Sequence, residues 1–233
     1  MRTKLHILKT IAKELALKPN ALNLFKKSVF GPWLNIKTEE HDNHMLHFLL
    51  LHQRRIENAN TKVPFYFDIG HHTLEFGRKE FCLLTGFRFG DVSLKHFEDR
   101  VSSFRARVFP KIAKVKGYDI QPLIETDDEF KKLSDEDAVR VCLLFALEYV
   151  FMGVELRHVI QEELMVLVDD FDAWNNFPWG ERIWKGFHNS VYNTISKNRE
   201  AHLTKIADGC KPQCTLNGFV FPLKVSNLSV LVR

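Results

Sequence analysis

The sequence predicts a mainly α-helical fold: one compact helical domain over residues 1–233, with a small β-hairpin near residues 65–76. A short C-terminal strand is an additional option. Apolar residues recur at helical spacing through most of the chain. The 233 residues are 45% hydrophobic and include 20 Phe, against only 11 Gly and 8 Pro, which supplies enough apolar surface for a core. There is no internal repeat, low-complexity tract or clear interdomain linker, so a single core is expected.

The first segment predicts a pair of short helices followed by a third. Apolar residues at helical spacing run over residues 5–17, and Lys18-Pro19-Asn20 stops that pattern. A second pattern covers residues 21–30 and closes at Gly31-Pro32, because Pro cannot continue a helix. Asp42 is a candidate N-cap for a third helix that continues to about Ile56.

The next segment predicts a β-hairpin that leads into a short helix. Aromatic and β-branched residues at 65–69 and 73–76 flank a turn at residues 70–72 that contains Gly70, a pattern typical of two antiparallel strands. Helical spacing then covers residues 78–85 and ends at Gly86.

Residues 91–124 have poor periodicity and are interpreted as an insertion or a mobile segment. The central helix follows. Ser134 and Asp137 have the spacing of a capping box, with Asp in place of Glu or Gln, directly before the apolar run 139–151. Gly153 breaks that helix, and further helices are expected over residues 156–168 and from Ile183 to about residue 198, joined by an aromatic linker at 169–180.

Composition places the chain in a broad class of protein. The formal net charge is only +4, which is weak evidence for nucleic-acid binding. The N-terminus has no uninterrupted apolar stretch, so no signal peptide is expected, and the most apolar segment, residues 139–154, contains charges and is too short to span a membrane. With four Cys and no disulfide pattern, we expect an intracellular protein of the nucleus or cytoplasm.

Several sequence blocks carry a family resemblance when they are taken together. They are Phe30-Gly31, Leu49-Leu50-Leu51, Phe65-Tyr66-Phe67, Leu74-Glu75-Phe76, Glu80 to Phe87, Val139 to Leu144, Val168 to Trp174, Phe177-Pro178-Trp179-Gly180 and Leu216 to Phe219. Over residues 24–225 these blocks resemble a plant-specific domain of unknown function. That domain commonly precedes a ubiquitin-like-protein (SUMO) cysteine protease domain in Mutator-like transposon-derived proteins. A more remote similarity is to the plant mobile domain.

Two departures from that family limit what the resemblance implies. The segment after Phe219 lacks the Trp-containing continuation of the family, and no protease domain follows in this sequence. The hydrolytic activity associated with the protease domain is therefore not carried over. The resemblance implies a non-catalytic protein-interaction module of a transposon-derived plant protein.

Metal-binding patterns are present but incomplete. His41, His44 and His47 recur every three residues and are interpreted as surface histidines. Cys210 and Cys214, with His202 nearby, lack the second pair that a structural zinc site needs. The acidic cluster Asp169, Asp170 and Asp172 could serve a metal-dependent hydrolase, but the turn context favours backbone capping. We expect no catalytic residue, metal or cofactor.

Two groups of residues are candidates for binding a partner. The first is a partner-binding or structural motif, for which packing into the core is the favoured interpretation: Asp170, Trp174, Phe177, Pro178, Trp179 and Gly180. The second is a candidate nucleic-acid-binding group: Arg100, Arg105, Arg107, Lys111, Lys114 and Lys116. A protein partner is preferred, nucleic acid is the alternative, no membrane association is expected, and the oligomeric state is not predicted.

Overall fold

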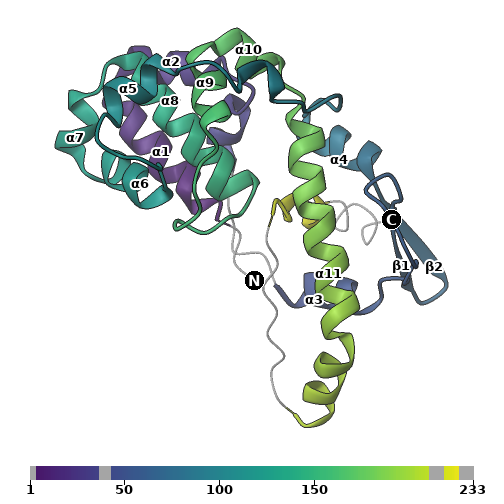
Figure 1. The fold of residues 1–233 in the computed structure, drawn as a ribbon. Coiled ribbons are helices and arrows are strands. Elements are labelled where there is room, and N and C mark those ends of the chain that lie inside the picture. Colours follow the sequence, from purple (N-terminus) through teal and green to yellow (C-terminus); the bar gives the residue numbers. More distant parts are fainter. Residues whose placement is uncertain (1–3, 37–42, 210–217, 226–233) are drawn as a thin grey trace. The chain divides into compact units, whose positions relative to one another are not determined.

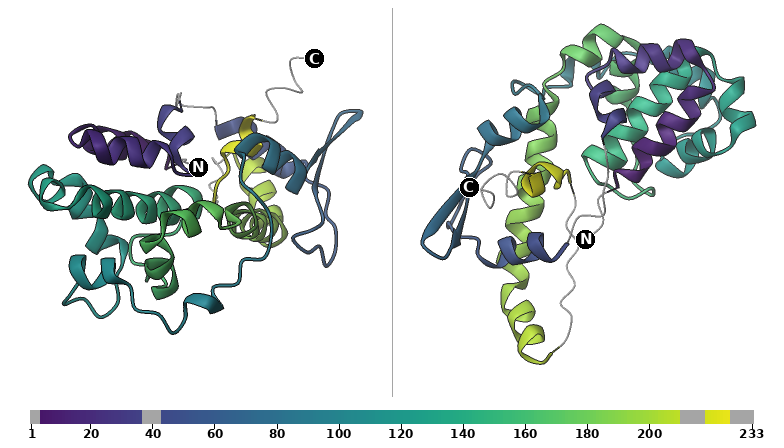
Figure 2. Two further views of the ribbon diagram at one scale, coloured as in Figure 1. Left: turned by 90° about the horizontal axis from the view of Figure 1, so that it is seen from above. Right: turned by 180° about the vertical axis from the view of Figure 1, so that it is seen from behind.

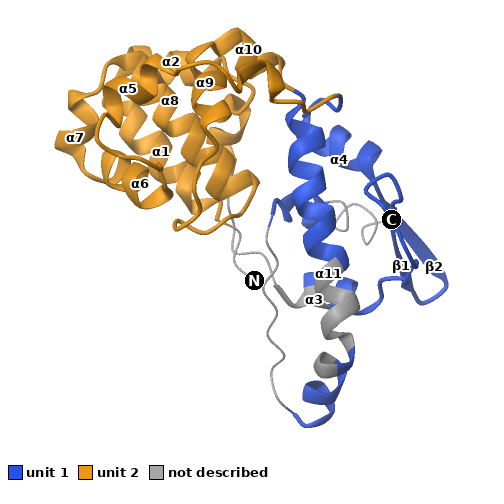
Figure 3. Cartoon of the chain, viewed as in Figure 1, with its two compact units in different colours: residues 1–3, 40–90, 178–233 blue, residues 4–39, 91–177 orange. Residues whose placement is uncertain are grey.

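The computed structural model describes residues 4–36, 43–209 and 218–225, and only the backbone of residues 43–45, 47, 193–199 and 201–202. The fold is mainly helical with one two-stranded antiparallel hairpin, as the sequence predicts (Figure 1). The chain divides into two compact units (Figure 3). Unit 1 comprises residues 1–3, 40–90 and 178–233, and unit 2 comprises residues 4–39 and 91–177. The expected single domain over residues 1–233 stays a prediction.

Unit 2 begins with the predicted helical pair. Helix α1 (His6–Ala16) is followed by α2 (Pro19–Lys26) and the 3₁₀ turn η1 (Gly31–Asn35). Pro19 is the first residue of α2 and not a residue between helices, because the first turn needs no backbone N–H from it. Leu8, Ile11, Leu15 and Phe25 are fully buried, so both helices contribute to the core of unit 2.

The central helix of unit 2 is α8 (Asp135–Phe145), which continues as a π-helical turn, η3 (Ala146–Phe151). The Ser134 hydroxyl accepts a hydrogen bond from the Asp137 backbone N–H at 3.1 Å, which confirms the predicted cap. Every residue from Asp137 to Phe151 is buried. Helices α1 and α2 pack on α8, and α1 lies alongside it in both further views (Figure 2).

The segment 91–124 contains more helix than its periodicity predicts. It contains the 3₁₀ turn η2 (Lys95–Phe97), α5 (Ser103–Val108) and most of α6 (Gly117–Glu125), and α7 (Asp127–Lys132) follows. Phe104, Phe109, Val115 and Ile120 are buried, and α5 and α6 pack on α8. The interpretation of residues 91–124 as an insertion or a mobile segment stays a prediction. Its helices are too short for a clear periodic signal.

The last two helices of unit 2 are α9 (Glu162–Asp169) and α10 (Phe171–Asn176). Helix α9 begins six residues later than predicted, because the preceding segment pairs with another part of the chain. Ile160 donates its backbone N–H to the Val115 carbonyl at 2.9 Å, and Val159 forms a bridge with Lys116. The predicted linker 169–180 is partly helical, since it contains α10.

Unit 1 contains α3 (Asn43–Leu51), the hairpin strands β1 (Phe65–Ile69) and β2 (His72–Phe76), and α4 (Arg78–Thr85). In the hairpin, Phe65 pairs with Phe76 and Ile69 pairs with His72. The turn is the two-residue Gly70-His71, with Gly70 at a φ of 59°. Gly86 ends α4 in the left-handed region at a φ of 71°, as the sequence predicts. Asp42, the candidate cap of α3, lies outside the described residues.

The long helix α11 (Trp179–Ala207) provides the core of unit 1. The rings of Phe65, Phe76 and Phe81 lie 5.5 to 6.0 Å from Trp184, measured between centroids. The helix extends beyond the predicted span at both ends. Residues 221–225 are helical, so the C-terminal strand is not found within residues 218–225. Residues 226–233 lie outside the described part. In the described residues, no helix combines the length and apolarity needed to cross a membrane.

Candidate functional site

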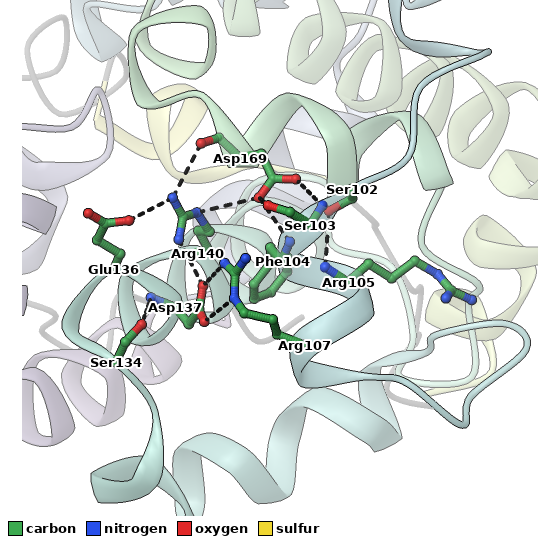
Figure 4. Close-up of polar contacts among 10 residues, drawn as sticks. All are labelled: Ser102, Ser103, Phe104, Arg105, Arg107, Ser134, Glu136, Asp137, Arg140 and Asp169. Carbon is green, nitrogen blue, oxygen red and sulfur yellow. Dashed lines mark hydrogen bonds and ion pairs between the residues drawn. The ribbon is translucent and has the colours of Figure 1, made fainter.

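Asp169 of the acidic cluster lies beside the start of α5, which carries two residues of the basic segment, Arg105 and Arg107 (Figure 4). Asp169, at the end of α9, accepts hydrogen bonds from the first turn of α5. The Ser103 backbone N–H donates to its Oδ2 at 2.8 Å, and the Phe104 N–H donates to its Oδ1 at 3.0 Å. The Ser103 hydroxyl adds a bond at 3.2 Å. Asp169 therefore satisfies the free amides of a helix start.

Arg140 is the hub of this charge network. Its guanidinium donates to Asp137 Oδ1 at 2.8 Å, to Glu136 Oε2 at 3.0 Å and to the Asp169 carbonyl at 3.3 Å. It also lies over the Phe171 ring, 4.9 Å from the centroid. The Arg140 side chain is only 8% exposed, so its charge is balanced inside the protein by partners on α8 and α9.

Asp137 receives a second guanidinium from α5. Arg107 donates to both oxygens of Asp137, from Nε at 3.1 Å and from Nη2 at 2.8 Å. Burial of Asp137 disfavours its charged form, but the hydrogen bonds from Arg107 and Arg140 outweigh this effect and lower its pKa. The same hydrogen bond raises the pKa of Arg107. Both groups stay ionised, and the network links α5, α8 and α9.

The structure separates the six basic residues of the candidate nucleic-acid-binding group into two kinds. Arg107 is paired as described. Arg105 donates to the carbonyls of Ile112 and Ala113 and forms an ion pair with Glu162 at 2.7 Å. These two arginines therefore support the local fold. The remaining members are exposed and form no ion pair within the described residues: Arg100, Lys111, Lys114 and Lys116.

Asp170 is an N-cap residue. Its Oδ1 accepts hydrogen bonds from the backbone N–H groups of Asp172 and Ala173, both at 3.0 Å, at the start of α10. This is the capping arrangement that the turn context favours. Within the described side chains, no group of three or more His, Cys, Asp or Glu residues could hold a metal ion.

The other metal patterns fall outside what the structure describes. His41, Cys210 and Cys214 are not described, and neither are the side chains of His44, His47 and His202. Cys142 is fully buried, and burial raises the pKa of its thiol. Its thiolate is therefore disfavoured.

The aromatic motif is divided between the two units. In unit 2, Trp174 is fully buried and its ring meets Phe30 edge-on at 6.0 Å between centroids. Phe177 is 8% exposed. In unit 1, Trp179 and Trp184 are fully buried, and Trp184 Nε1 donates to the Thr61 carbonyl at 2.7 Å. Burial, the favoured interpretation of these aromatic side chains, is thus observed.

Pro178 and Gly180 have geometric roles at the start of α11. Pro178 is the N-cap residue. The Gly180 backbone N–H donates to the Arg88 carbonyl at 2.8 Å. A Cβ at Gly180 would lie 2.6 Å from that carbonyl oxygen and 2.7 Å from the oxygen of Phe87. Only Gly permits this close approach between two backbone segments.

Sequence reasoning missed the central role of Arg140. The available signal was a lone Arg inside the apolar run 139–151, placed three and four residues after Asp137 and Glu136. Such spacing puts the opposite charges on one helical face. The partnership of Asp169 with α5 had no local signal, since the two segments are about 65 residues apart.

Comparison with protein families relates much of the chain to a domain of unknown function. A sequence model described as a domain of unknown function (DUF1985) matches residues 50–190. No match was found among curated proteins or among solved structures. The matched span includes the hairpin, α4, the charge network and the start of α11.

Proposed function

The chain belongs to the DUF1985 family of domains of unknown function, and we propose that it acts as a non-catalytic protein-interaction module. The supporting observation is what the charged side chains of the network contact. Arg140, Asp137 and Asp169 engage one another or nearby backbone, and Asp170 caps α10. These groups serve to position helices and are not free to act on a substrate. The module then contributes binding surface instead of reaction chemistry.

The setting of the module follows from the resemblance of its sequence blocks. We place it in a transposon-derived plant protein of the nucleus or cytoplasm. The blocks Glu80 to Phe87 and Phe177 to Gly180 lie within the matched span. In this setting the natural partner is another protein, and no cofactor is required.

The test is competitive capture from a plant cell extract. The tagged full chain is expected to retain a defined set of proteins, and an excess of untagged chain should displace them. Retention should be unchanged by EDTA, because no metal takes part. A captured set that does not respond to the untagged competitor would contradict specific binding, and the proposal would fail.

A second candidate function is nucleic-acid binding through residues 100–116. It is favoured by Lys111, Lys114 and Lys116, which are exposed and have no ion pair within the described residues. Fluorescence anisotropy with labelled single- and double-stranded DNA at low salt tests it. Affinity should fall steeply with salt and should be lost in the triple Lys→Glu variant. Arg107→Gln is the control because Arg107 is already paired. A metal-dependent hydrolase remains the weakest alternative, since Asp169 and Asp170 are engaged in backbone caps.

A further inference from the structure

The outer edge of β2 carries backbone groups that no part of the described chain satisfies. In the hairpin, the pairs Tyr66–Glu75 and Asp68–Thr73 alternate with the directly bonded pairs. On the β1 side, the outward groups are used: Arg54 donates its N–H to the Tyr66 carbonyl at 2.7 Å, and Asp68 donates to the His52 carbonyl at 2.9 Å. On the β2 side, the outward groups belong to Thr73 and Glu75.

These groups of β2 are accessible. Thr73 and Glu75 are exposed, and neither has a backbone hydrogen bond on the outer side within the described residues. The hairpin itself is held firmly, because Phe65, Phe67 and Phe76 are buried against the core of unit 1. A firmly held strand with an open edge is the arrangement to which an extended peptide adds as a further strand.

The side chains around the edge define the chemistry of that peptide. On the solvent face, Arg54 contacts Asp68 at 3.0 and 2.7 Å, and the Thr73 hydroxyl donates to Asp68 at 2.8 Å. The Asp68 charge is therefore neutralised. Glu75 lies on the same face, is exposed, and forms no ion pair within the described residues. A basic side chain beside Glu75 would complement this charge.

The opposite face of β2 favours apolar side chains in the added strand. Leu74 pairs with Phe67 across the hairpin and is only half-buried. Side chains of an added strand alternate between faces, so residues on either side of the basic one would lie along Leu74 and Phe76. A second copy of this chain fits less well, because it would bring another unpaired Glu75 to the edge without a basic partner.

We propose that the outer edge of β2 binds an extended segment of another protein by strand addition, with a Lys or Arg of that segment paired with Glu75 and apolar residues on either side of it. This rests on the proposed function as a protein-interaction module and names the surface and the kind of partner. The backbone of Thr73 and Glu75 provides the hydrogen bonds, and Glu75 provides the selectivity.

The test uses the full chain and a library of ten-residue peptides randomised at every position. Selected peptides should contain a basic residue flanked by apolar, β-branched residues. On binding, the amides of Thr73 and Glu75 should become protected from hydrogen exchange. Thr73→Pro removes one outward N–H and leaves the backbone hydrogen bonds of the hairpin in place, although it also removes the hydroxyl bond to Asp68. It should weaken binding about five- to tenfold. Glu75→Lys should select acidic residues in place of basic ones.

The control is Glu57→Lys, which makes the same charge change at another exposed position of unit 1 and should select the same peptides as the parent. Equal binding by Thr73→Pro, with unchanged selection by Glu75→Lys, would overturn the strand-addition site. Self-association that responds to Thr73→Pro would also overturn it, in favour of a second copy. If no peptide binds while competitive capture succeeds, this inference fails and the proposed function stands. If capture also fails, both are wrong.

Discussion

At the residue scale, the charge network of unit 2 is centred on Arg140. The side chain is nearly enclosed, and it contacts Asp137, Glu136 and the Asp169 carbonyl. A buried ion pair need not add net stability, but removing one partner leaves the others without compensation. The network therefore supports the fold of unit 2 only while all of its charged partners are present.

Arg140→Met is expected to lower the free energy of unfolding by about 3–5 kcal/mol, because the buried Asp137 loses its buried partner and keeps only Arg107, which is half-exposed. Chemical denaturation followed by circular dichroism measures the change. Arg107→Met is the matched control: it breaks a pair with the same carboxylate from a half-exposed position and should have a much smaller effect. Equal losses for the two variants would show that burial does not determine the contribution of each arginine.

His188 is expected to make unit 1 sensitive to acid. Its Nε2 lies 3.2 Å from the Val63 carbonyl, and its ring stacks on Phe65 at 4.6 Å. Its Nδ1 is buried and has no partner within the described residues. Burial lowers the pKa of His188, while the bond to Val63 opposes that shift. Below about pH 6.5 the unfolded chain takes up a proton first, so stability is complete above that pH and is lost as pH falls towards the lowered pKa.

The measurement is the free energy of unfolding between pH 7.5 and 5 for the parent chain and for His188→Gln. The variant keeps a donor for the Val63 carbonyl but does not titrate, so its stability should fall less steeply over this interval. His71→Gln, at an exposed turn position, should leave the slope of the parent unchanged. Identical slopes in all three proteins would remove His188 as the cause.

At the element scale, the entry into α11 depends on a close approach of two backbone segments. Gly180→Ala would place a Cβ 2.6 Å from the Arg88 carbonyl oxygen. That oxygen belongs to the backbone, which cannot move away as the end of a flexible side chain can. We expect a loss of about 1–3 kcal/mol, the usual range for overpacking. Thermal unfolding is the measurement. Gly90→Ala, whose Cβ would meet only the Pro178 ring at 3.3 Å, should have a smaller effect, and the reverse order would contradict this explanation.

Elements with strong local signals could be predicted from the sequence. Helix α4 begins and ends at the predicted residues because Gly77 and Gly86 bound it and Phe81 marks its buried side. The start of α9 could not be predicted, since Ile160 and Val159 are held extended by Val115 and Lys116 from a distant part of the chain. Tertiary pairing of this kind leaves no periodic pattern in the segment itself.

In the candidate site, too, local contacts could be predicted from the sequence and contacts between distant segments could not. The caps by Ser134 and Asp170 could be predicted, because each bond spans two or three residues. The contacts of Asp169 with Ser103 and of Arg107 with Asp137 depend on how α5 packs. No spacing rule relates those segments, so basic residues that hold the fold could not be told from the exposed lysines by sequence alone.

At the scale of the whole molecule, each unit has a buried core of its own and is assembled from separate stretches of chain. We expect Arg140→Met to speed hydrogen exchange in α5, α8 and α9 while the amides of β1, β2 and α4 keep their protection. Hydrogen exchange read by mass spectrometry checks this. A uniform increase over both units would instead support the single cooperative domain that the sequence predicts.

The covering of α8 by α1 and α2 has a practical consequence for anyone who prepares this protein. Both covering helices precede residue 50, where the span shared with the family begins. A recombinant fragment limited to residues 50–190 would expose the apolar face of α8 to solvent. It would also end within α11. Such a piece is expected to precipitate, so the limits of a homology match are the wrong place to cut.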